Sequence, residues 1–408
     1  MVEENKSSND VNLSFKESGG FKYYLIAGEA SGDLHGSNLV KELKKLDKAA
    51  TFRCWGGDLM QAAGAEVVKH YKDLAFMGFI EVIKNLPTIL SNLKFCKEDI
   101  QRYSPDVLIL IDYPGFNLRI AEWAKRAGFK VVYYISPQVW AWKESRVKGI
   151  KKYVDKMLVI LPFEKEFYQK WDYEVNYIGH PLVQVVEEAV QEKKDSLLHC
   201  VGARKEEKTV DGSFEKKIVA ILPGSRKQEI AVKLPLMLEA SKNFPQHQFI
   251  VAQAPAQPFE FYRQILANYP DVWIAKSGQT YSLLLKSTAA LVTSGTATLE
   301  TALFGVPQVV CYKGSNISYQ IAKRLVKIKY ISLVNLIMDK PVVKELIQNE
   351  LTVQNITIEL NEILNNPQHI AQLKSDYAAL KNLLQKEGAA SARAAQEIIG
   401  FLQANVSG

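Results

Sequence analysis

Residues 107–117 of this chain read Val-Leu-Ile-Leu-Ile-Asp-Tyr-Pro-Gly-Phe-Asn. The five apolar residues have the length of a strand, and no polar residue alternates with them, so we expect this strand to be covered on both faces. The Pro-Gly turn ends the strand, and a helix-length amphipathic segment follows it. This order of strand, turn and helix predicts a parallel sheet flanked by helices.

The same order recurs on both sides of this stretch. Short apolar runs end in Gly, Asp or Pro and are followed by helical patterns. Strands are predicted in the first half at residues 23–27, 51–55, 107–111, 130–134, 157–160 and 175–178, and in the second half at 218–222, 248–252, 272–275, 290–293 and 308–312. Right-handed βαβ units of this kind predict an α/β protein with two doubly wound, Rossmann-like domains that face each other across a cleft.

The boundary between the two halves is predicted near residue 185. Residues 186–217 are dense in charge and end without periodicity, which favours a helix followed by a linker. Residues 1–20 are expected to be a flexible tail, and residues 21–185 the first domain. The second domain is expected at 218–408, with C-terminal helical patterns at 342–348, 352–364 and 369–402 packing back towards the first domain.

The composition is that of an ordinary soluble globular protein. Of 408 residues, 47% are hydrophobic and 23% are charged, which excludes a disordered chain, a collagen and a disulfide scaffold. The net charge of +7 favours anionic partners. The four cysteines lack CxxC spacing, which indicates free thiols in a reducing compartment. With a polar start and no apolar run near the roughly 18–20 residues of a membrane span, we expect a cytosolic chain that can still sit on a membrane.

The turns after the strands are the candidate sites, because open parallel sheets bind ligands beyond the carboxyl ends of their strands. The first such turn, residues 28–36, reads GEASGDLHG and opens a helix whose free N–H groups can meet an anion or a sugar hydroxyl. An alternative is a structural turn capped by Ser31 or Asp33. The turn matches neither GxGxxG nor the P-loop pattern. Its candidate cleft residues are Glu29, Ser31, Gly32 and Asp33, with His35 as a reserve base.

Two further turns of the first half carry chemistry. Asp112 ends a strand and can accept a proton from an incoming hydroxyl, although it can instead cap the next helix, a role that suits Asn117 better. Residues 135–143 read ISPQVWAWK and precede a basic segment that begins with Arg146. Gln138 and Trp140 are candidates to hold a sugar or an acyl chain, with these cations available for a phosphate. A solvated basic helix beside core tryptophans remains the alternative.

Two turns of the second half predict a site for a nucleoside diphosphate. Residues 222–226, LPGSR, and 293–300, TSGTATLE, both join a strand to a helix, and each offers backbone N–H groups at a helix N-terminus. Arg226 can bind a phosphate with its guanidinium fork, and Glu300 can accept hydrogen bonds from a ribose diol. The predicted binding residues are Gly224, Ser225, Arg226, Ser294, Gly295, Thr296, Ala297, Thr298 and Glu300.

Two remaining features concern metals and membranes. The six histidines form no HxxxH or HxH pair and the chain has no DxD motif, so we expect no metal and no cofactor. Residues 76–95 hold more large apolar side chains than a surface segment should, interleaved with lysines. This pattern fits a membrane or acyl-chain surface, and it fits a core helix pair equally well. Its candidate residues are Met77, Phe79, Ile80, Leu86, Leu90 and Phe95.

Taken in order, these motifs resemble the lipid-A-disaccharide synthase family of inverting GT-B glycosyltransferases. The resemblance is collinear over nearly the whole chain. Val334 departs from it, because the family usually has Pro before the residue that matches Asn335. The motifs that carry it are AGEASGD, MGFIEV, IDYPGFN, YYISPQVWAWKESRVKGI, IGHPL, LPGSR, TSGTATLE and ISLVNLI.

The resemblance implies that UDP-2,3-diacylglucosamine donates its sugar to 2,3-diacylglucosamine 1-phosphate, giving the β-1,6-linked disaccharide 1-phosphate of lipid A and UDP. It implies Asn335 as a further UDP contact, an acceptor- and membrane-side first domain and a UDP-sugar-binding second domain. Asp112 is the best-placed carboxylate for the base, because it ends a buried strand in the domain facing the nucleotide; the alternative is that it orients the acceptor. It places the protein peripherally on the anionic cytosolic face of a Gram-negative inner membrane, without nucleic acid and with a homodimer left open. The alternatives are another GT-B nucleotide-sugar enzyme, such as an epimerase or a soluble-acceptor transferase, and a non-catalytic nucleotide-sugar- or lipid-binding protein.

Overall fold

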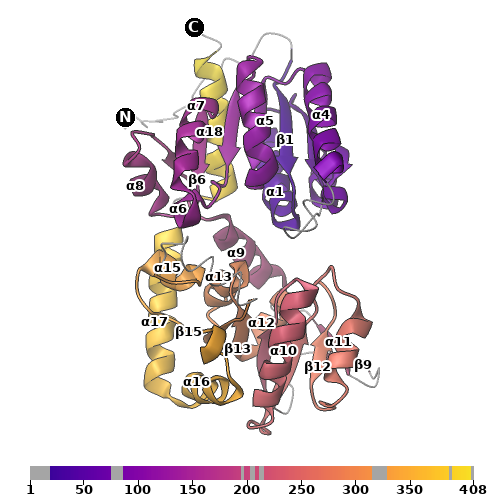
Figure 1. Cartoon of the computed structure of the whole chain (residues 1–408), viewed down its shortest axis with the longest axis vertical. Coiled ribbons are helices and arrows are strands. Elements are labelled where there is room, and N and C mark those ends of the chain that lie inside the picture. Colours follow the sequence, from indigo (N-terminus) through magenta and orange to yellow (C-terminus); the bar gives the residue numbers. More distant parts are fainter. Residues whose placement is uncertain are drawn as a thin grey trace, which may run out of the picture.

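The computed structural model describes residues 19–74, 86–193, 197–202, 207–210, 216–314, 329–385 and 388–405. Two sheets, each flanked by helices, form two domains that lie one above the other in Figure 1. Helices α9 (Pro181–Lys193), α13 (Thr296–Leu303) and α15 (Leu333–Met338) lie on the side of the second domain that faces the first.

The first sheet has seven parallel strands among the described residues, in the order β3-β2-β1-β4-β5-β6-β7. The strand order reverses between β1 and β4, which makes their carboxyl ends the topological switch point where ligands of such sheets bind. The strands are β1 (Lys22–Ala27), β2 (Thr51–Gly56), β3 (Glu66–His70), β4 (Val107–Ile111), β5 (Val131–Tyr134), β6 (Lys156–Val159) and β7 (Asn176–Tyr177).

Helices cover both faces of this sheet, and a hydrophobic core lies on each side of it. All five residues of β4 are buried, as the uninterrupted apolar run predicts. The helices are α1 (Ala30–Leu46), α2 (Asp58–Ala62), α4 (Leu86–Tyr103), α5 (Pro114–Arg126), α6 (Val139–Trp142), α7 (Val147–Tyr153) and α8 (Glu164–Gln169), with the short 3₁₀ helices η1 (Tyr71–Leu74) and η2 (Glu144–Arg146).

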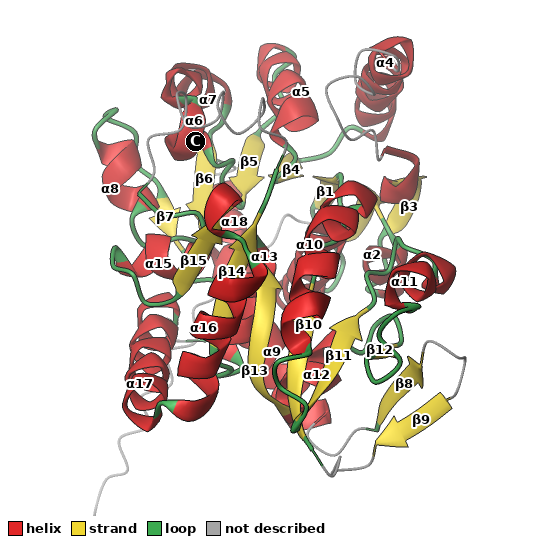
Figure 2. Cartoon of the chain, turned by 60° about the horizontal axis from the view of Figure 1, so that its bottom comes forward, coloured by secondary structure: helices red, strands yellow, loops and turns green. Residues whose placement is uncertain are grey.

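The second sheet has eight strands in its described part, in the order β15-β14-β13-β10-β11-β12-β8-β9. Figure 2 shows β13, β10 and β11 side by side beneath α10 (Lys227–Ser241) and α16 (Val353–Asn365). The strands are β8 (Leu198–Gly202), β9 (Glu207–Val210), β10 (Lys217–Leu222), β11 (His247–Ala252), β12 (Trp273–Ala275), β13 (Ser287–Thr293), β14 (Gln308–Tyr312) and β15 (Lys344–Ile347). The remaining elements are α11 (Phe259–Leu266), α12 (Thr280–Lys286), α17 (Pro367–Leu384), α18 (Ala390–Ala404) and η3 (Gln348–Glu350).

The eleven predicted strands are confirmed, with ends that differ by a few residues. The linker predicted within 186–217 was wrong in part, because β8 and β9 pair antiparallel there and β8 continues the sheet at β12. A charged sequence is compatible with strands at a sheet edge, where charge discourages pairing with another chain. The helix predicted at 342–348 was also wrong: Lys344–Ile347 is the edge strand β15, and a short apolar run does not distinguish the two structures.

The C-terminal helix returns to the first domain. Ala394, Ala395, Ile398 and Leu402 of α18 share a core with Leu39 of α1. The crossing is fixed at its start, because the Tyr177 hydroxyl donates to the Leu383 carbonyl at 3.1 Å and the His180 backbone N–H donates to the Leu384 carbonyl at 3.1 Å. The end of the chain therefore connects the two domains a second time.

Candidate active site

The turn after β4 has a strained backbone. Asp112 and Tyr113 both have positive φ angles, 44° and 49°, a left-handed conformation that costs a non-glycine residue on the order of 1–3 kcal/mol. Three hydrogen bonds hold the turn: the Asp112 carbonyl accepts from the Asn117 amide at 2.8 Å and from the Tyr133 hydroxyl at 2.5 Å, and the Asp112 N–H donates to Tyr134 at 3.3 Å. Strain maintained by such contacts is typical of functional sites.

Asn117 does not cap helix α5, as its sequence position had suggested. Its buried amide instead donates to the carbonyls of Ile26 at 3.4 Å and Ile111 at 3.2 Å, in addition to Asp112. Tyr113 is the N-cap residue of α5. The amide therefore connects the ends of β1 and β4 to the turn that carries Asp112.

The Asp112 carboxyl is set up to exchange a proton near neutral pH. Burial, with a smaller contribution from the negative charge of Glu29, raises the pKa of Asp112 to about 6. A general base is most effective when its pKa lies near the working pH, because it is then ionised and still basic. Asp112 is therefore mostly charged at pH 7 and has gained basicity over an ordinary aspartate.

The glycine-rich turn lies against Asp112. A Cβ on Gly28 would stand 2.3 Å from the Tyr113 ring, so only glycine lets these two turns approach. Glu29 and Ser31 are exposed, whereas Gly32 is buried, with the Cβ of Ala27 at 3.0 Å from the Cβ position it lacks. Glu29 and Ser31 are thus available at the same sheet edge as Asp112.

Asp33 has a structural role that its sequence position did not reveal. Its carboxylate is buried and accepts backbone hydrogen bonds from Gly57 at 2.7 Å, Leu59 at 3.1 Å and Met60 at 3.1 Å, which fixes the start of α2. Because these bonds turn the carboxylate towards α2, we remove Asp33 from the residues that contact the acceptor.

His35 is buried next to His180, and burial lowers its pKa to about 4. Its Nδ1 has no hydrogen-bond partner within the described part of the chain. A base with a pKa near 4 is weaker than Asp112 at neutral pH, so the geometry and electrostatics favour Asp112 for proton transfer.

The loop after β5 connects the first domain to the second. Gln138 is exposed, and the indole N–H of Trp140 donates to the Glu164 carboxylate at 3.3 Å. Trp140 also packs against the core of the second domain. Sequence reasoning missed Glu164, whose burial raises its pKa to about 7, because nothing in the local pattern marks it.

The two predicted nucleotide-binding turns line one pocket of about 220 Å³ at the ends of β10 and β13. Gly224 has a φ of +111° and Gly295 a φ of +147°, so both positions require glycine. The lining includes the predicted residues Gly224, Ser225, Ser294, Gly295, Thr296, Ala297 and Glu300, and also Glu229, Gln253, Thr280 and Thr293.

Residues outside the pocket hold several of its polar side chains by hydrogen bonds. The Tyr281 hydroxyl donates to the Glu300 carboxylate at 2.8 Å, and burial raises the pKa of Glu300. Ser294 Oγ donates to the Ile331 carbonyl at 2.9 Å. Thr293 Oγ1 is buried and has no hydrogen-bond partner among the described residues, which is a position that a ligand can satisfy.

Three residues that were predicted to contact UDP do not line this pocket. Arg226 is the N-cap residue of α10, with an exposed side chain 3.5 Å from Glu229, and it does not line the pocket. Thr298 is buried and its hydroxyl donates to the Gly295 carbonyl at 2.8 Å. Asn335 is buried, and its amide is occupied by both backbone groups of Val343 and by Glu345, so we correct its predicted role from UDP contact to scaffold.

Sequence reasoning missed three residues of the pocket, Glu229, Gln253 and Thr280. For Gln253 and Glu229, their positions in the sequence could have indicated the pocket. Gln253 follows β11 directly, at the same sheet edge as the predicted turns. Glu229 lies one helical turn after Arg226, and its carboxylate stands 3.7 Å from the buried Lys233 ammonium.

The predicted membrane stretch is described only from α4 onward. Leu90 and Phe95 are 58% and 41% exposed, which is unusual for large apolar side chains and fits an interaction surface. Met77, Phe79 and Ile80 lie outside the described residues, as does the side chain of Leu86.

The described residues contain no group of His, Cys, Asp and Glu side chains arranged to hold a metal ion. Among them, no helix combines the length and the apolar character that crossing a bilayer requires.

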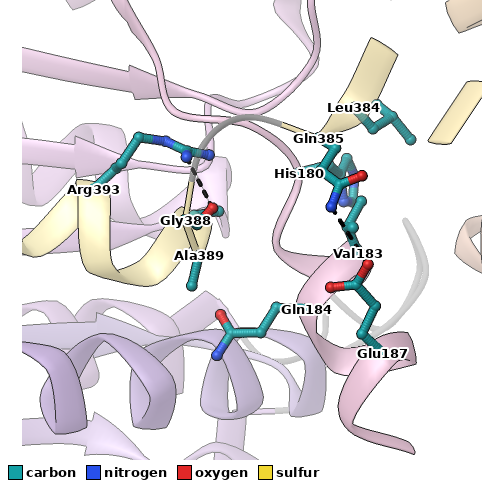
Figure 3. Close-up of a pocket in the computed structure, with 10 residues that line it drawn as sticks. His180, Val183, Gln184, Glu187, Leu384, Gln385, Gly388, Ala389 and Arg393 are labelled. Carbon is teal, nitrogen blue, oxygen red and sulfur yellow. Dashed lines mark hydrogen bonds between the residues drawn. The ribbon is translucent and has the colours of Figure 1, made fainter. Parts of the chain in front are cut away.

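A separate pocket of about 230 Å³ lies where the chain crosses between the domains (Figure 3). His180, Gln184 and Glu187 of the α9 side face Gln385 and Gly388 from the break between α17 and α18, and Arg393 from α18. The Lys381–Glu187 ion pair at 2.9 Å and the Ser391–Gln184 hydrogen bond at 2.9 Å close it. This pocket is part of the connection between the domains and shares no lining residue with the pocket at the predicted nucleotide-binding turns.

The two parallel-sheet domains define a GT-B-like fold, which glycosyltransferases share with epimerases. The structure is similar to that of CalG4, the calicheamicin glycosyltransferase, with a TM-score of 0.57 and 15% identity over 94% of this chain and 98% of that one. It is also similar to UDP-GlcNAc 2-epimerase from Neisseria meningitidis, with a TM-score of 0.57 and 12% identity over 93% of this chain and 99% of the other. At these identities the likeness establishes the fold alone.

The sequence comparisons identify the family. The family model described as lipid-A-disaccharide synthetase matches residues 23–399. The lipid-A-disaccharide synthase of Geobacter metallireducens is 39% identical over 383 residues, covering 93% of this chain and 96% of the relative, and that of Coxiella burnetii strain RSA 331 is 37% identical over 370 residues, covering 90% and 95%. The chain belongs to the lipid-A-disaccharide synthase family, the glycosyltransferases of lipid A biosynthesis, and the resemblance seen in the sequence is confirmed.

Proposed function

We propose that this chain transfers 2,3-diacylglucosamine from UDP-2,3-diacylglucosamine to the 6-hydroxyl of 2,3-diacylglucosamine 1-phosphate, with UDP as the other product. Family membership supports the lipid A precursors as substrates. The observation that supports binding of the UDP part of the donor is the pocket at the ends of β10 and β13, which both predicted turns line. Release of UDP that depends on the acceptor lipid tests the proposal, and release that is independent of the acceptor would contradict it.

In this proposal the second domain binds the donor. The N-terminus of α13 and the backbone of Gly224 and Ser225 meet the diphosphate, because uncompensated N–H groups and the helix dipole favour an anion there. Glu300 accepts hydrogen bonds from the ribose hydroxyls. Arg226, exposed at the surface with its charge 3.5 Å from Glu229, turns to the diphosphate when the donor is bound.

We expect Arg226→Ala to weaken UDP binding about 10- to 100-fold, since a charge-assisted hydrogen bond contributes roughly 1.5–3 kcal/mol. Calorimetric titration with UDP measures this effect. Lys227→Ala removes a neighbouring cation of the same helix and serves as the control. An Arg226→Ala protein that binds UDP as tightly as the natural chain would remove Arg226 from the site.

In the first domain, Asp112 is proposed to act as the general base. The acceptor hydroxyl attacks the anomeric carbon from the face opposite UDP, its proton passes to the Asp112 carboxylate, and the bond to the UDP oxygen breaks. One displacement of this kind inverts the anomeric centre, giving a β-linked product from an α-linked donor. The raised pKa of Asp112, its position at the switch point and its strained, fixed backbone support this role. Glu29, Ser31 and Gly32 lie beside it, with Gln138 and Trp140 beyond the next strand, as candidate acceptor contacts.

Turnover is expected to need no metal ion. The diphosphate charge is met by helix N-termini and Arg226 in this proposal, so activity should survive dialysis against excess EDTA within about twofold of the untreated enzyme. The measurement is the initial rate of UDP release with and without chelator. A complete loss that added Mg²⁺ restores would show that a cation carries part of this charge.

We further propose that the protein sits peripherally on the cytosolic face of the inner membrane, with α4 towards the lipid. Replacing Leu90 and Phe95 by Ser should weaken co-sedimentation with anionic vesicles at least about tenfold, because inserting each side chain into the interface contributes on the order of 1.5 kcal/mol or more. Lys94 and Lys97 add about 1 kcal/mol each near an anionic surface, so binding should also weaken as salt rises.

The matched control for this prediction replaces Ile358 and Leu383 by Ser. These side chains are 51% and 43% exposed and lie in the second domain. Their replacement removes an exposed apolar area comparable to that removed by the α4 variant. If the α4 variant and the control bind vesicles equally well, α4 is not the membrane contact.

A further inference from the structure

The largest of the pockets described in the first domain has no role in the account so far, although its lining includes Arg146, one of the cations that the sequence offered for a phosphate. It is a groove of about 360 Å³ between helices α5 and α7. Its lining combines the apolar residues Leu118, Ala121, Ile150 and Val154 with Arg119 and Arg146. Apolar residues beside cations suit an amphiphilic anion better than a purely apolar or purely ionic ligand.

The groove begins at the turn that carries the proposed base. Pro114 and Gly115 line it, and Gly115 follows Asp112 by three residues, so the groove starts at most about 11 Å of extended chain from Asp112. The Arg119 side chain turns back along α5 and donates to the Gly115 carbonyl, which places its charge at this end.

Arg146 lies at the same end. Burial raises the pKa of the Tyr133 phenol well above its usual value, and the positive charge of Arg146 opposes that rise. The same phenol donates to the Asp112 carbonyl at 2.5 Å. Arg146 is therefore near the back of the turn that Asp112 occupies, and the two arginines frame the groove close to the base.

We propose that Arg119 and Arg146 bind the phosphate monoester of the acceptor lipid at the Asp112 end of this groove. The proposal rests on the proposed function. In the acceptor, the 1-phosphate is carried by C1 and the attacking 6-hydroxyl by the carbon attached to C5, the two ring carbons that flank the ring oxygen, so a phosphate held beside the Asp112 turn fixes where the hydroxyl can lie. Guanidinium groups suit this role, because their planar forks bind phosphate oxygens in pairs and stay charged at every physiological pH.

The carboxylate of Glu122, which also lines the groove, does not oppose this assignment. Glu122 is paired with Arg126 at 2.7 Å, and Arg126 also contacts the Tyr153 hydroxyl at 3.3 Å. The negative charge at the far end of the groove is thus balanced by Arg126.

The test compares two acceptors, 2,3-diacylglucosamine 1-phosphate and the same lipid without phosphate, in neutral detergent micelles that contain no anionic lipid. We expect the natural chain to favour the phosphorylated acceptor, because a site built for a group rejects an analogue that lacks it. Arg119→Gln/Arg146→Gln should raise the KM for the phosphorylated acceptor about 10- to 100-fold, leave the KM for the donor unchanged, and abolish the preference between the two acceptors.

The control Lys165→Gln/Lys170→Gln removes the same charge from exposed positions in and just after α8 and should keep both the preference and the KM values. The inference is overturned if Arg119→Gln/Arg146→Gln keeps the donor KM and still prefers the phosphorylated acceptor as strongly as the natural chain does. A defect that appears only with anionic vesicles and equally for both acceptors also overturns it, since that marks a lipid-headgroup contact. Failure of the natural chain to use either acceptor would instead contradict the proposed function.

Discussion

Asp112→Asn is expected to lower turnover about 10²- to 10⁴-fold, the usual contribution of a positioned general base. The substitution keeps the size of the side chain and removes its capacity to take a proton. It should also keep the backbone, because asparagine is one of the few residues that tolerate a positive φ such as the 44° seen here. UDP affinity should therefore stay near that of the natural chain, and the free energy of unfolding at neutral pH should not fall, because the variant no longer buries a charge.

The pH dependence provides an independent check of the same residue. Since burial raises the pKa of Asp112 to about 6, the carboxylate is ionised above that pH and protonated below it. We expect kcat/KM of the natural enzyme to rise with pH through about 6, because that profile reports the free enzyme's base. The Asn variant should lack this limb. Turnover within a few-fold of the natural chain, with the limb intact, would move the base to another residue, with His35 the first to test.

Asp33→Ala is expected to destabilise the protein by about 3–5 kcal/mol. The substitution leaves the three backbone N–H groups of Gly57, Leu59 and Met60 without their acceptor, and hydrogen bonds to a charged group contribute roughly 1.5–3 kcal/mol each without being additive. Urea-induced unfolding measures the change. Asp33→Asn keeps one acceptor oxygen and should lie between the two proteins.

Asp58→Ala is the control for this experiment. Asp58 is the first residue of α2, the helix whose start Asp33 holds from α1. The Asp58 side chain is 73% exposed and pairs with His70 and Lys72 near the surface, so its removal should lower the free energy of unfolding by less than about 1 kcal/mol. If Asp33→Ala unfolds like the natural chain and has instead a raised acceptor KM, then Asp33 contacts the acceptor as its sequence position first suggested.

Much of this fold could be predicted because its buried strands carry a strong local signal. β4 is five apolar residues bounded by a Pro-Gly turn, and β10 and β13 end in glycine turns that line one pocket, as the sequence predicts. Since parallel strands place their carboxyl ends at one edge, the turns after the strands were sufficient to select Asp112, Gly224, Gly295 and Glu300 as candidate residues.

The rest depended on contacts that no local pattern contains. Asp33 and Asn335 look like ligands from their positions, yet their polar atoms are used by α2 and by residues 343 and 345. The strands β8, β9 and β15 are short, and β9 and β15, at the two edges of the sheet, are partly charged. The strand structure of β8 and β15 is set by pairing with β12 and β14, which are distant in sequence, and β9 pairs in turn with β8. The α5–α7 groove arises from two helices packed side by side, which residue spacing within either helix does not specify.

The most direct measurement of the central claim is product identification. The purified chain is incubated with UDP-2,3-diacylglucosamine and 2,3-diacylglucosamine 1-phosphate, and the mixture is analysed by mass spectrometry beside an Asp112→Asn sample. The account predicts UDP and a tetraacyl disaccharide 1-phosphate in equal amounts, with the disaccharide strongly reduced in the variant. UDP without disaccharide, or neither product from a folded protein that binds UDP, would contradict it.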